Sequence, residues 1–536
     1  LAGISLMGRH LPSLFFVILL ALMLSNLLQR AVGNGKLQMH MSTTTASGIY
    51  LHIPFCRRRC FYCDFPIKVV GDKPSARVAA GEYYTKLLID DIRSWMSVQN
   101  QQPLQKLLTV DTIYFGGGTP SLLPDNCVAD IMQELRDTFD ITSDAEVTFE
   151  MDPGTFTYER LNKLRDDCGI NRISMGVQSF DADSLKLCGR PHGPDDTIRA
   201  LKDLQKADWT DFSIDLISSL PHMTIDKWID TLEQTITSDA SHISVYDLQV
   251  EEKTAFDRWY TPGEFPLPSD DLSADMYRTA VRMLTNAGYE HYEVSNYAKP
   301  GHRSRHNQKY WRCAPVWAFG MSAVSYLRGE RFERPRKMEG YVKFVEELQL
   351  SHGGIRFGGV TTTTSNSTSI EAVAKPAPAP DILEAVMLSL RTKDGLNLTS
   401  YRERYGLETV SMILEALLPY SRISGSSDSS GSSAGNQSEQ ALVEVVDETG
   451  NLLAGTDVIK FWSTVAHHSI NQGGGGFCSD DINTGNAETV FEGISHNPAV
   501  NEVVDCLLNY TVRLNDPEGF LLSNEIISSI FAKIEQ

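Results

Sequence analysis

The chain has 536 residues, of which 42% are hydrophobic and 22% carry a charge, a balance typical of globular proteins with two or three domains. Its 68 acidic and 48 basic residues give a formal net charge of −20, which argues against a nucleic-acid partner. Apart from three near the amino end, the nine cysteines are scattered. This pattern predicts reduced, mostly buried thiols and no disulfide framework.

An apolar segment, Leu14 to Leu24, lies near the amino end between Arg9 and Arg30. It is short for a membrane span and resembles the core of a targeting sequence. We therefore treat residues 1–47 as a leader outside the fold and expect no stable membrane span in the mature protein. Two interpretations stay open: an organellar address (plastid or mitochondrion), or a start at Met39 or Met41 that leaves the protein cytoplasmic.

Three cysteines, Cys56, Cys60 and Cys63, follow a short strand-like run. Three thiolates at this spacing can bind three irons of a [4Fe–4S] cluster, for which four cysteines are usual. The spacing resembles the signature of the radical S-adenosylmethionine (SAM) superfamily, in which the amino and carboxylate groups of SAM bind the fourth iron. The alternative is a zinc knuckle that a distant His or Cys completes.

Short β-rich runs alternate with amphipathic, helix-length stretches between residues 48 and 295. The predicted strands are 49–53, 112–115, 146–150, 172–175, 211–217 and 242–248, and the predicted helices are 81–96, 126–138, 158–166, 194–207 and 225–237. Consecutive β–α units predict a parallel sheet with right-handed crossovers. Since six units are too few to close an eight-stranded barrel, we predict an α/β fold with an open, partial (βα)6 barrel over residues 48–345, with ligands at the carboxyl ends of its strands.

The second half of the chain contains low-complexity segments. Residues 346–380 read as a linker with a Thr-, Ser- and Pro-rich insert, and further insertions lie near 424–440 and 468–495. Helices are expected at 381–391 and 401–418, with a strand and helix within 511–533. We therefore predict a smaller, mostly helical domain over residues 381–536.

Several polar or glycine-rich motifs stand at the predicted strand ends. The run Gly116 to Gly118 lets the backbone approach a ligand closely and present N–H groups to an anion, although a plain tight turn is equally compatible. Glu150 is placed to accept hydrogen bonds from SAM, or is a solvated charge at a strand end. Asp215 lies between apolar residues, so we expect it to pair with Arg190 or with a ligand.

A basic segment, residues 299–337, contains ten Lys or Arg and only two acidic residues. It also holds aromatic residues, His306 and Cys313. Cations suit the propionates of a tetrapyrrole, aromatic rings suit its faces, and His or Cys suits its iron. The segment therefore suggests haem, with His306 as the iron ligand or as a residue that orients it; a solvated basic surface is the alternative.

Together, these motifs resemble the HemN/HemW family of radical SAM proteins over most of residues 48–340. The resemblance rests on YLHIPFC, FYCDF, GGGTPS, RISMGVQSF, the run HISVYDLQVEE and HNQKYW. It implies a [4Fe–4S] cluster on the three cysteines and a SAM contacted by Tyr50, Gly117, Glu150 and Val324, with Tyr62 against its adenine. In the coproporphyrinogen oxidases of this family, the positions of Gly118, Thr119, Gln178, Arg190 and Asp215 contact a second SAM. The tail from Asp381 is similar to the family's carboxyl-terminal domain.

One position separates two functional interpretations. The oxygen-independent coproporphyrinogen III oxidases carry a fourth cysteine where this chain has Phe65. That departure is shared with the HemW-type haem chaperones. The resemblance therefore implies a haem carrier that passes haem to acceptor proteins, and the alternative is oxidative decarboxylation of coproporphyrinogen. The acceptor protein and the electron donor are not indicated by the sequence.

Overall fold

A computed structural model describes residues 46–99, 109–327, 329–350, 381–417, 420, 443–447, 451–453, 510–514, 516, 518–521, 526–528 and 530–531. These residues belong to two compact units that divide between residues 378 and 379. Nearly all of the predicted leader, most of the predicted linker and both predicted insertions lie outside the described residues.

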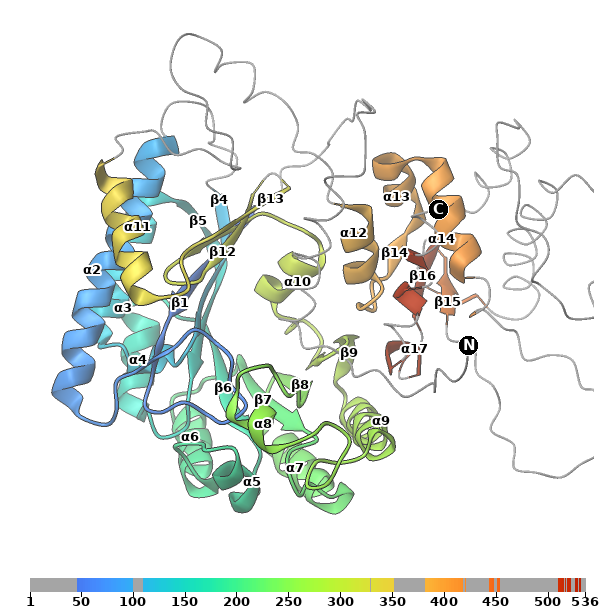
Figure 1. Cartoon of the computed structure of the whole chain (residues 1–536), viewed down its shortest axis with the longest axis horizontal. Coiled ribbons are helices and arrows are strands. Elements are labelled where there is room, and N and C mark those ends of the chain that lie inside the picture. Colours follow the sequence, from blue (N-terminus) through green and yellow to red (C-terminus); the bar gives the residue numbers. More distant parts are fainter. Residues whose placement is uncertain are drawn as a thin grey trace, which may run out of the picture. The chain divides into compact units, whose positions relative to one another are not determined.

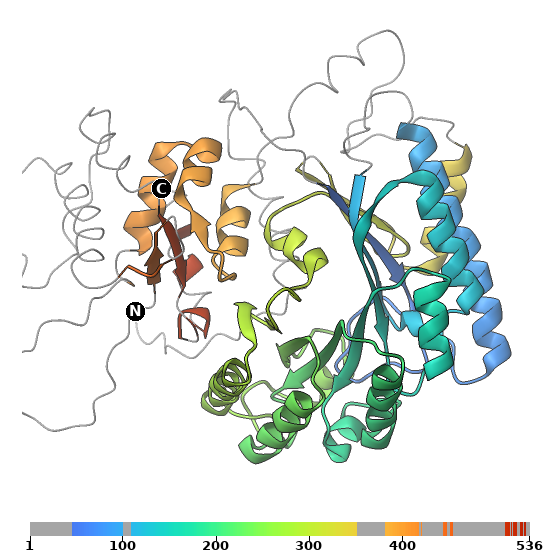
Figure 2. The same ribbon diagram turned by 180° about the vertical axis from the view of Figure 1, so that it is seen from behind.

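The first unit is built on six parallel strands that lie side by side in chain order. They are β1 (Ser47–Ile53), β4 (Thr109–Gly117), β5 (Asp140–Met151), β6 (Arg172–Gln178), β7 (Phe212–Ser218) and β8 (His242–Asp247). The helices between them are α2 (Pro74–Gln99), α3 (Asp125–Thr138), α4 (Tyr158–Asp166), α5 (Ala182–Leu187), α6 (Pro194–Lys206) and α7 (Ile225–Thr237). Helices cover the outer face of the curved sheet (Figures 1 and 2). The predicted partial barrel is confirmed.

The sheet continues past both ends of this series. Strands β11 (Val316–Phe319), β12 (Val324–Leu327) and β13 (Glu330–Glu333) extend it beside β1, and β10 (Asn296–Ala298) and β9 (Glu290–Glu293) extend it beside β8. Because β1 and β8 each pair with one of these added strands, they do not pair with each other and the barrel stays open. The sequence analysis missed the added strands, which have only three or four residues each.

Strand β1 shows how the two faces of the sheet divide. Ile49, Leu51 and Ile53 are completely buried, whereas the Tyr50 ring stacks on the Tyr114 ring of β4 at 6.1 Å. Successive side chains of a strand point to opposite faces. The apolar set therefore packs under the outer helices, and the aromatic and polar set lines the inside of the barrel.

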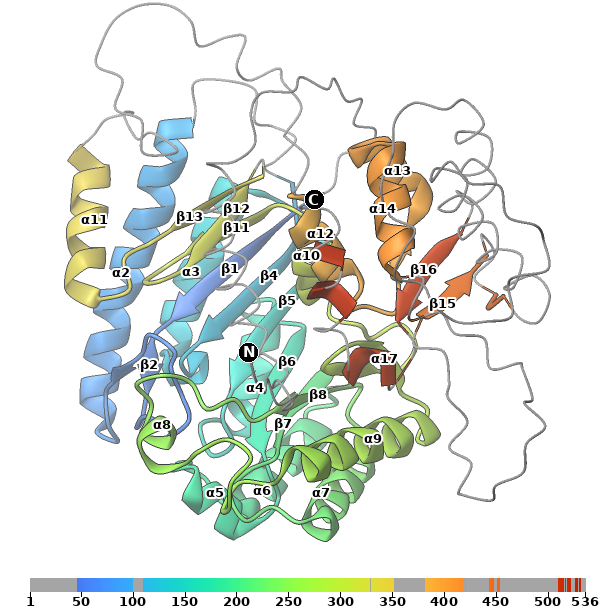
Figure 3. The same ribbon diagram turned by 45° about the vertical axis from the view of Figure 1, so that its right-hand side comes forward.

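The remaining elements of this unit are short strands or helices at the rims. They are β2 (Phe55–Cys56), β3 (Lys68–Val69), the 3-10 helix η1 (Pro120–Leu122), α8 (Ala255–Trp259), α9 (Asp270–Asn286), α10 (Arg305–Trp311) and α11 (Met338–Leu350). The arrows of β1 and β4 point toward β2 and α8, so these two elements lie at the carboxyl ends of the strands (Figure 3).

A buried ion pair joins helix α2 to the added strands. Arg334 donates to both carboxylate oxygens of Asp91, at 2.6 and 3.0 Å, and both side chains are completely buried. Tyr341 of α11 and the Gly320 amide also donate to Asp91. These contacts tie α2, α11 and the end of β11 together. Removing one partner of a buried ion pair lowers the free energy of unfolding far more than removing one partner of an exposed pair.

We expect Asp91→Asn to lower the free energy of unfolding by about 3–5 kcal/mol, because it leaves the Arg334 guanidinium buried without a counter-charge. The neighbouring Asp90→Asn removes a half-exposed carboxylate and should change it by less than about 0.5 kcal/mol. Chemical denaturation of both variants measures the difference. Equal denaturation midpoints for the two variants would contradict the stabilising role of the Asp91–Arg334 pair.

The second unit combines helices with a three-stranded antiparallel sheet. Its elements are α12 (Ile382–Ser389), β14 (Leu396–Asn397), α13 (Leu398–Tyr405), α14 (Leu407–Leu417), β15 (Val443–Val446), β16 (Thr511–Leu514) and α17 (Glu518–Leu521), with the strands in the order β14, β16, β15. The prediction of one helix over 401–418 is wrong. Gly406 adopts φ +86 between α13 and α14, a conformation that ends the first helix.

Candidate functional site

The three cysteines lie on one loop between β2 and β3. Phe55 and Cys56 pair with Lys68 and Val69, and the loop between these strands carries Cys60 and Cys63. All three thiols are half-buried. Burial raises the pKa of Cys56 to about 12 and that of Cys63 to about 11, so without a metal these thiols are protonated at neutral pH. Iron binding exchanges such protons for the metal.

The spacing of these side chains bears on the zinc alternative. In the described part of the chain, no three His, Cys, Asp or Glu side chains converge closely enough to hold one metal ion. A cubane cluster is bound differently, because each thiolate holds a separate iron. Three thiols on one loop fit a [4Fe–4S] cluster, for which we expect Cys56, Cys60 and Cys63 as the ligands.

The glycine run packs directly against this loop. The Gly118 amide donates to the Ile53 carbonyl at 2.8 Å, and the Thr119 amide donates to the Phe55 carbonyl at 2.7 Å. A Cβ atom on Gly118 would lie 2.7 Å from the Phe55 oxygen, so only glycine permits this approach. The Gly117 amide donates to Glu150. Two amides of the glycine run, those of Gly117 and Gly118, therefore bond to the protein itself, which favours the tight-turn alternative for this loop.

Glu150 is the centre of a small polar group inside the barrel. Its carboxylate accepts hydrogen bonds from the Tyr114 hydroxyl at 2.8 Å and from the Gly117 amide at 3.2 Å. Burial raises the pKa of Glu150 to about 8, and the two hydrogen bonds oppose that rise. A Cβ atom on Gly116 would meet Tyr114, Tyr50 and Glu150, which explains why this strand end carries glycine. The alternative of a solvated charge does not hold for Glu150.

Arg190 reaches the cysteine loop from the end of α5. It pairs with Asp152, donates to the Gly176 carbonyl at 2.7 Å, and lies 3.4 Å from both the Cys60 sulfur and the Tyr62 hydroxyl. The residues that contact Arg190 come from three separate segments. Sequence spacing indicated neither Asp152 as its partner nor its position against a cysteine.

The expected pairing of Asp215 with Arg190 is wrong. Asp215 accepts hydrogen bonds from the hydroxyls of Ser174 at 2.7 Å and Ser213 at 3.0 Å. Burial raises the pKa of Asp215, and these hydroxyls lower it. Because its own strand β7 and the neighbouring strand β6 supply these hydroxyls, the hydrogen bonds of the carboxylate do not come from Arg190.

Three other predicted residues, Gln178, Tyr62 and Val324, come from separate elements. Gln178 ends β6 with φ 68, a conformation that non-glycine residues rarely adopt and that is often found at functional sites. Tyr62 lies beside Phe256, with their ring centroids 6.2 Å apart. Val324 begins β12, and β11 lies between that strand and β1. The sequence analysis missed Tyr114. Because it lies two residues before Gly116 on the same strand, it shares a face with that glycine, and this spacing could have indicated that it faces Glu150.

His306 lies on the amino-terminal side of the barrel, away from the cysteine loop. Its ring nitrogens are 3.0 Å from the Thr112 hydroxyl and 3.1 Å from the Tyr310 hydroxyl, and the side chain is buried. Burial lowers the pKa of His306 to about 3, so the imidazole is neutral. A neutral imidazole is the form that binds iron, but one nitrogen must first leave its present partner. His306 as a haem ligand therefore stays a prediction.

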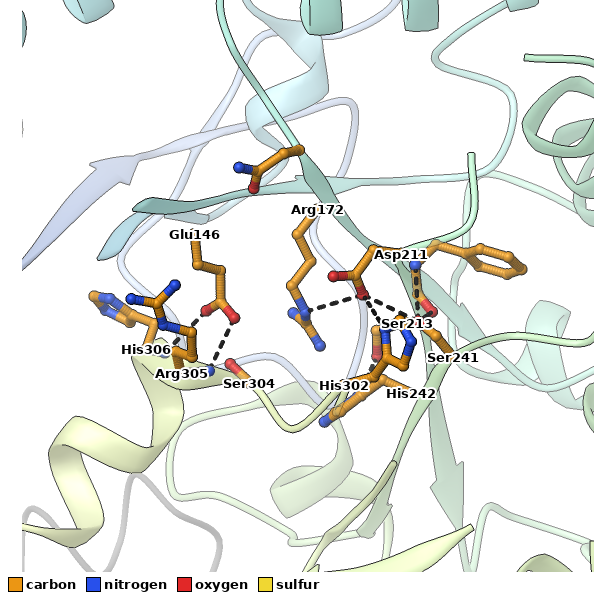
Figure 4. Close-up of polar contacts among 12 residues, drawn as sticks. Glu146, Arg172, Asp211, Ser213, Ser241, His242, His302, Ser304, Arg305 and His306 are labelled. Carbon is orange, nitrogen blue, oxygen red and sulfur yellow. Dashed lines mark hydrogen bonds and ion pairs between the residues drawn. The ribbon is translucent and has the colours of Figure 1, made fainter. Parts of the chain in front are cut away.

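The surroundings of His306 are densely polar (Figure 4). The Glu146 carboxylate accepts hydrogen bonds from the Arg305 and His306 amides, both at 2.9 Å, and so holds the first turn of α10. The side chain of Arg172 lies between Glu146 and Asp211. Only 2% of the Arg172 side chain is exposed, and its Nε atom lies 3.9 Å from the Oδ1 atom of Asp211.

Five of the ten cations of the basic segment form ion pairs with acids elsewhere in the barrel. The ion pairs are Lys299–Asp239, Arg303–Glu290, Arg305–Asp144, Lys309–Asp111 and Arg334–Asp91. Trp311 and Trp317 are buried in the core. A tetrapyrrole would have to compete with these ion pairs for the cations, and the interpretation of the segment as a tetrapyrrole site stays a prediction.

Comparisons with known proteins agree with this site. The Radical SAM superfamily matches residues 50–235. A protein of Synechocystis sp. named "Heme chaperone HemW" is 41% identical over 349 residues, which cover 65% of this chain and 78% of that protein. The chain belongs to the HemW family of radical SAM proteins. The family implies a [4Fe–4S] cluster and SAM, and Cys56, Cys60 and Cys63 stay the predicted ligands of the cluster.

Two further relatives define the range of the family. The mouse protein "Radical S-adenosyl methionine domain-containing protein 1, mitochondrial" is 32% identical over 282 residues, which cover 53% of this chain and 61% of that protein. The structure of the Escherichia coli coproporphyrinogen III oxidase HemN is similar in fold, with a TM-score of 0.54 at 22% identity over 70% of this chain and 82% of that one. The sequence relatives favour the HemW type over the oxidase alternative. In the part of the chain that the structure describes, no helix is both long and apolar enough for a bilayer span.

We expect SAM to bind more tightly to the cluster-loaded HemW-type protein as the pH rises from about 7 to about 9. Glu150 has a raised pKa of about 8, so its carboxyl is mostly neutral below that pH and ionised above it, and only the ionised form attracts the cationic ligand. Equilibrium dialysis measures the affinity. Glu150→Gln should flatten this dependence, whereas Glu159→Gln, which changes an exposed carboxylate of α4, should not. The same slope in Glu150→Gln would contradict the assignment.

Tyr114→Phe should shift the same pH profile upward. The variant removes the hydrogen bond that lowers the pKa of Glu150, so ionisation requires a higher pH. A hydrogen bond to a charged group is worth about 1.5–3 kcal/mol, so we expect about tenfold weaker SAM binding at neutral pH. Rescue of the affinity at high pH separates this electrostatic effect from a general loss of structure. If the midpoint of the pH dependence of SAM affinity did not change in Tyr114→Phe, the hydrogen bond would not control the pKa of Glu150.

Proposed function

We propose that this protein binds haem and delivers it to acceptor proteins, as the name of its Synechocystis relative indicates for that protein. The observation that carries the proposal is 41% identity over 78% of a protein named as a haem chaperone. Phe65 supports it, because the position of the fourth cysteine of the oxidases is occupied by a half-exposed phenylalanine. We also propose that the second unit corresponds to the carboxyl-terminal domain of the HemN/HemW family.

When bound, the cluster and SAM supply a one-electron reductive cleavage of the sulfonium. The chain's own contribution is to hold these ligands inside the barrel. Thr119 donates to the Cys56 sulfur at 3.6 Å, and Arg190 places a positive charge beside Cys60. Both contacts stabilise a thiolate where iron is to bind.

One SAM per chain fits the contacts better than two. Of the residues that match a second SAM site, Gly118 and Thr119 use their amides on the cysteine loop. Arg190 is engaged by Asp152, and Asp215 by two serine hydroxyls. A second SAM would have to displace several of these bonds.

For haem, we propose His306 as the ligand, with its bond to Tyr310 as the contact that opens. The Thr112 hydroxyl, 3.0 Å from Nδ1, would then keep the ring oriented, and the Nε2 atom freed from Tyr310 would face the iron. Hydrogen bonding of one ring nitrogen while the other binds the metal is the usual arrangement for a histidine ligand.

The deciding experiment is a parallel titration of anaerobic, cluster-loaded protein with haem and with coproporphyrinogen III. We expect stoichiometric haem uptake and no porphyrinogen turnover in the presence of SAM and a reductant. Turnover would instead establish the oxidase activity, the second candidate, which the fold of the Escherichia coli enzyme favours.

His306→Gln tests the ligand within that experiment. Glutamine can keep hydrogen bonds to Thr112 and Tyr310 but is a poor iron ligand, so the haem absorbance should change and the affinity fall by about tenfold or more while the fold persists. His302→Gln, at a partly exposed histidine, and Cys313→Ser are the matched controls. An unchanged haem spectrum in His306→Gln would remove His306 from the site without removing the carrier function.

A further inference from the structure

A further cysteine, Cys188, lies beside the cysteine loop. It caps the end of helix α5, and its side chain is completely buried. Its carbonyl accepts a hydrogen bond from the Phe61 amide at 3.0 Å. This bond joins the peptide that follows Cys60 to the peptide that follows Cys188, so standard peptide dimensions leave the two Cα atoms no more than about 7 Å apart. Cysteines that form disulfides have Cα separations of about 4.4–6.8 Å.

The sulfur of Cys60 also faces the segment that contains Cys188. Arg190, two residues after Cys188, donates from its Nη1 atom to the Cys60 sulfur at 3.4 Å. Gly189, between them, packs so closely that a Cβ atom on it would lie 3.0 Å from the ring of Phe61. Three consecutive residues thus contact the backbone after Cys60, the next side chain and the Cys60 sulfur itself.

The electrostatics of Cys188 agree with this placement. Burial raises the pKa of the Cys188 thiol to about 12, and the next cause of the rise is Cys60. Such an influence is expected when two sulfur atoms lie near each other. The buried Cys168 offers a comparison, because its sulfur lies 4.0 Å from the Asp125 carbonyl among the outer helices.

We propose that Cys60 and Cys188 form a reversible disulfide in the cluster-free chain when it meets a low-molecular-weight disulfide such as oxidised glutathione. Cys60 reacts first, because it is half-buried whereas Cys188 is completely buried. Its sulfur bonds to one sulfur of glutathione disulfide, the S–S bond of the reagent breaks, and one glutathione leaves with the proton of Cys60.

Cys188 completes the reaction. Its sulfur bonds to the Cys60 sulfur, the mixed disulfide breaks, and the second glutathione leaves with the proton of Cys188. The two protein thiols are thereby oxidised by two electrons, and the small disulfide is reduced to two thiols. In reducing compartments such disulfides are transient and often sense the redox state.

The disulfide would control when the cluster is assembled. We expect Cys60 to bind one iron of the cluster, and iron binding requires a free thiolate. A chain with the Cys60–Cys188 bond therefore lacks one ligand until a thiol reductant restores it, and a loaded chain has no free Cys60 to oxidise. The inference rests on the cluster that the family implies and not on haem delivery.

The test treats the full chain, freed of iron by a chelator, with oxidised glutathione and maps disulfides by mass spectrometry of an unreduced digest. We expect a peptide that joins Cys60 to Cys188 in the unaltered protein and in Cys168→Ala, the control that removes another buried thiol. Cys188→Ala should instead keep glutathione on Cys60, because the thiol that displaces it is absent. Cluster-loaded protein should give at least about tenfold less of the joined peptide.

Iron uptake tests the consequence on the same samples. The oxidised chain should take up at least about tenfold less iron and sulfide into a cluster than the same chain after treatment with dithiothreitol. Absence of the Cys60–Cys188 peptide from the unaltered iron-free protein, or disulfides confined to Cys56, Cys60 and Cys63, would overturn the proposal. Equal iron uptake before and after reduction would overturn the control of cluster assembly.

Discussion

The contact between the glycine run and the cysteine loop is the constraint on which the site depends. Gly118 and Thr119 extend β4 past its end and bond to the backbone of Ile53 and Phe55, which extends β1. The lack of a Cβ atom at Gly118 allows two backbones to meet at van der Waals distance. Because the loop is fixed there, its cysteines lie at the same end of the barrel as Glu150, which we expect to contact SAM.

Side chains inside the barrel link its cysteine-loop end with the end at which His306 lies. Tyr114 donates its hydroxyl to Glu150 and stacks its ring on His306, with centroids 5.1 Å apart. His306 in turn contacts Thr112 and Tyr310. One aromatic side chain therefore lies between the position expected to contact SAM and the residue proposed to bind haem. Such polar contacts in a low-dielectric interior specify one arrangement, since each group left unpaired would be costly.

Charge in this protein is organised by folding rather than by sequence order. The acidic residues that neutralise Arg303, Lys309 and Arg334 come from β9, β4 and α2. Among the cations outside these pairs, Arg336 at the end of the segment acts on Asp64 in the cysteine loop. A run of like charges in the sequence thus becomes an internal set of ion pairs and a separate exposed surface.

The sequence by itself determined the parallel barrel and was enough to predict the metal ligands, because both depend on local information. Hydrophobic period placed the helices at 158–166 and 225–237, and the cysteine spacing within one loop predicted the cluster. Tertiary structure alone decided the partners of charged groups: Arg190 with Asp152, Asp215 with serine hydroxyls, and Glu146 with the first turn of α10. It also decided that Gly406 divides a helix. Ion pairing and burial act between residues far apart in the chain, and their choice among many possible partners follows only from the packed fold.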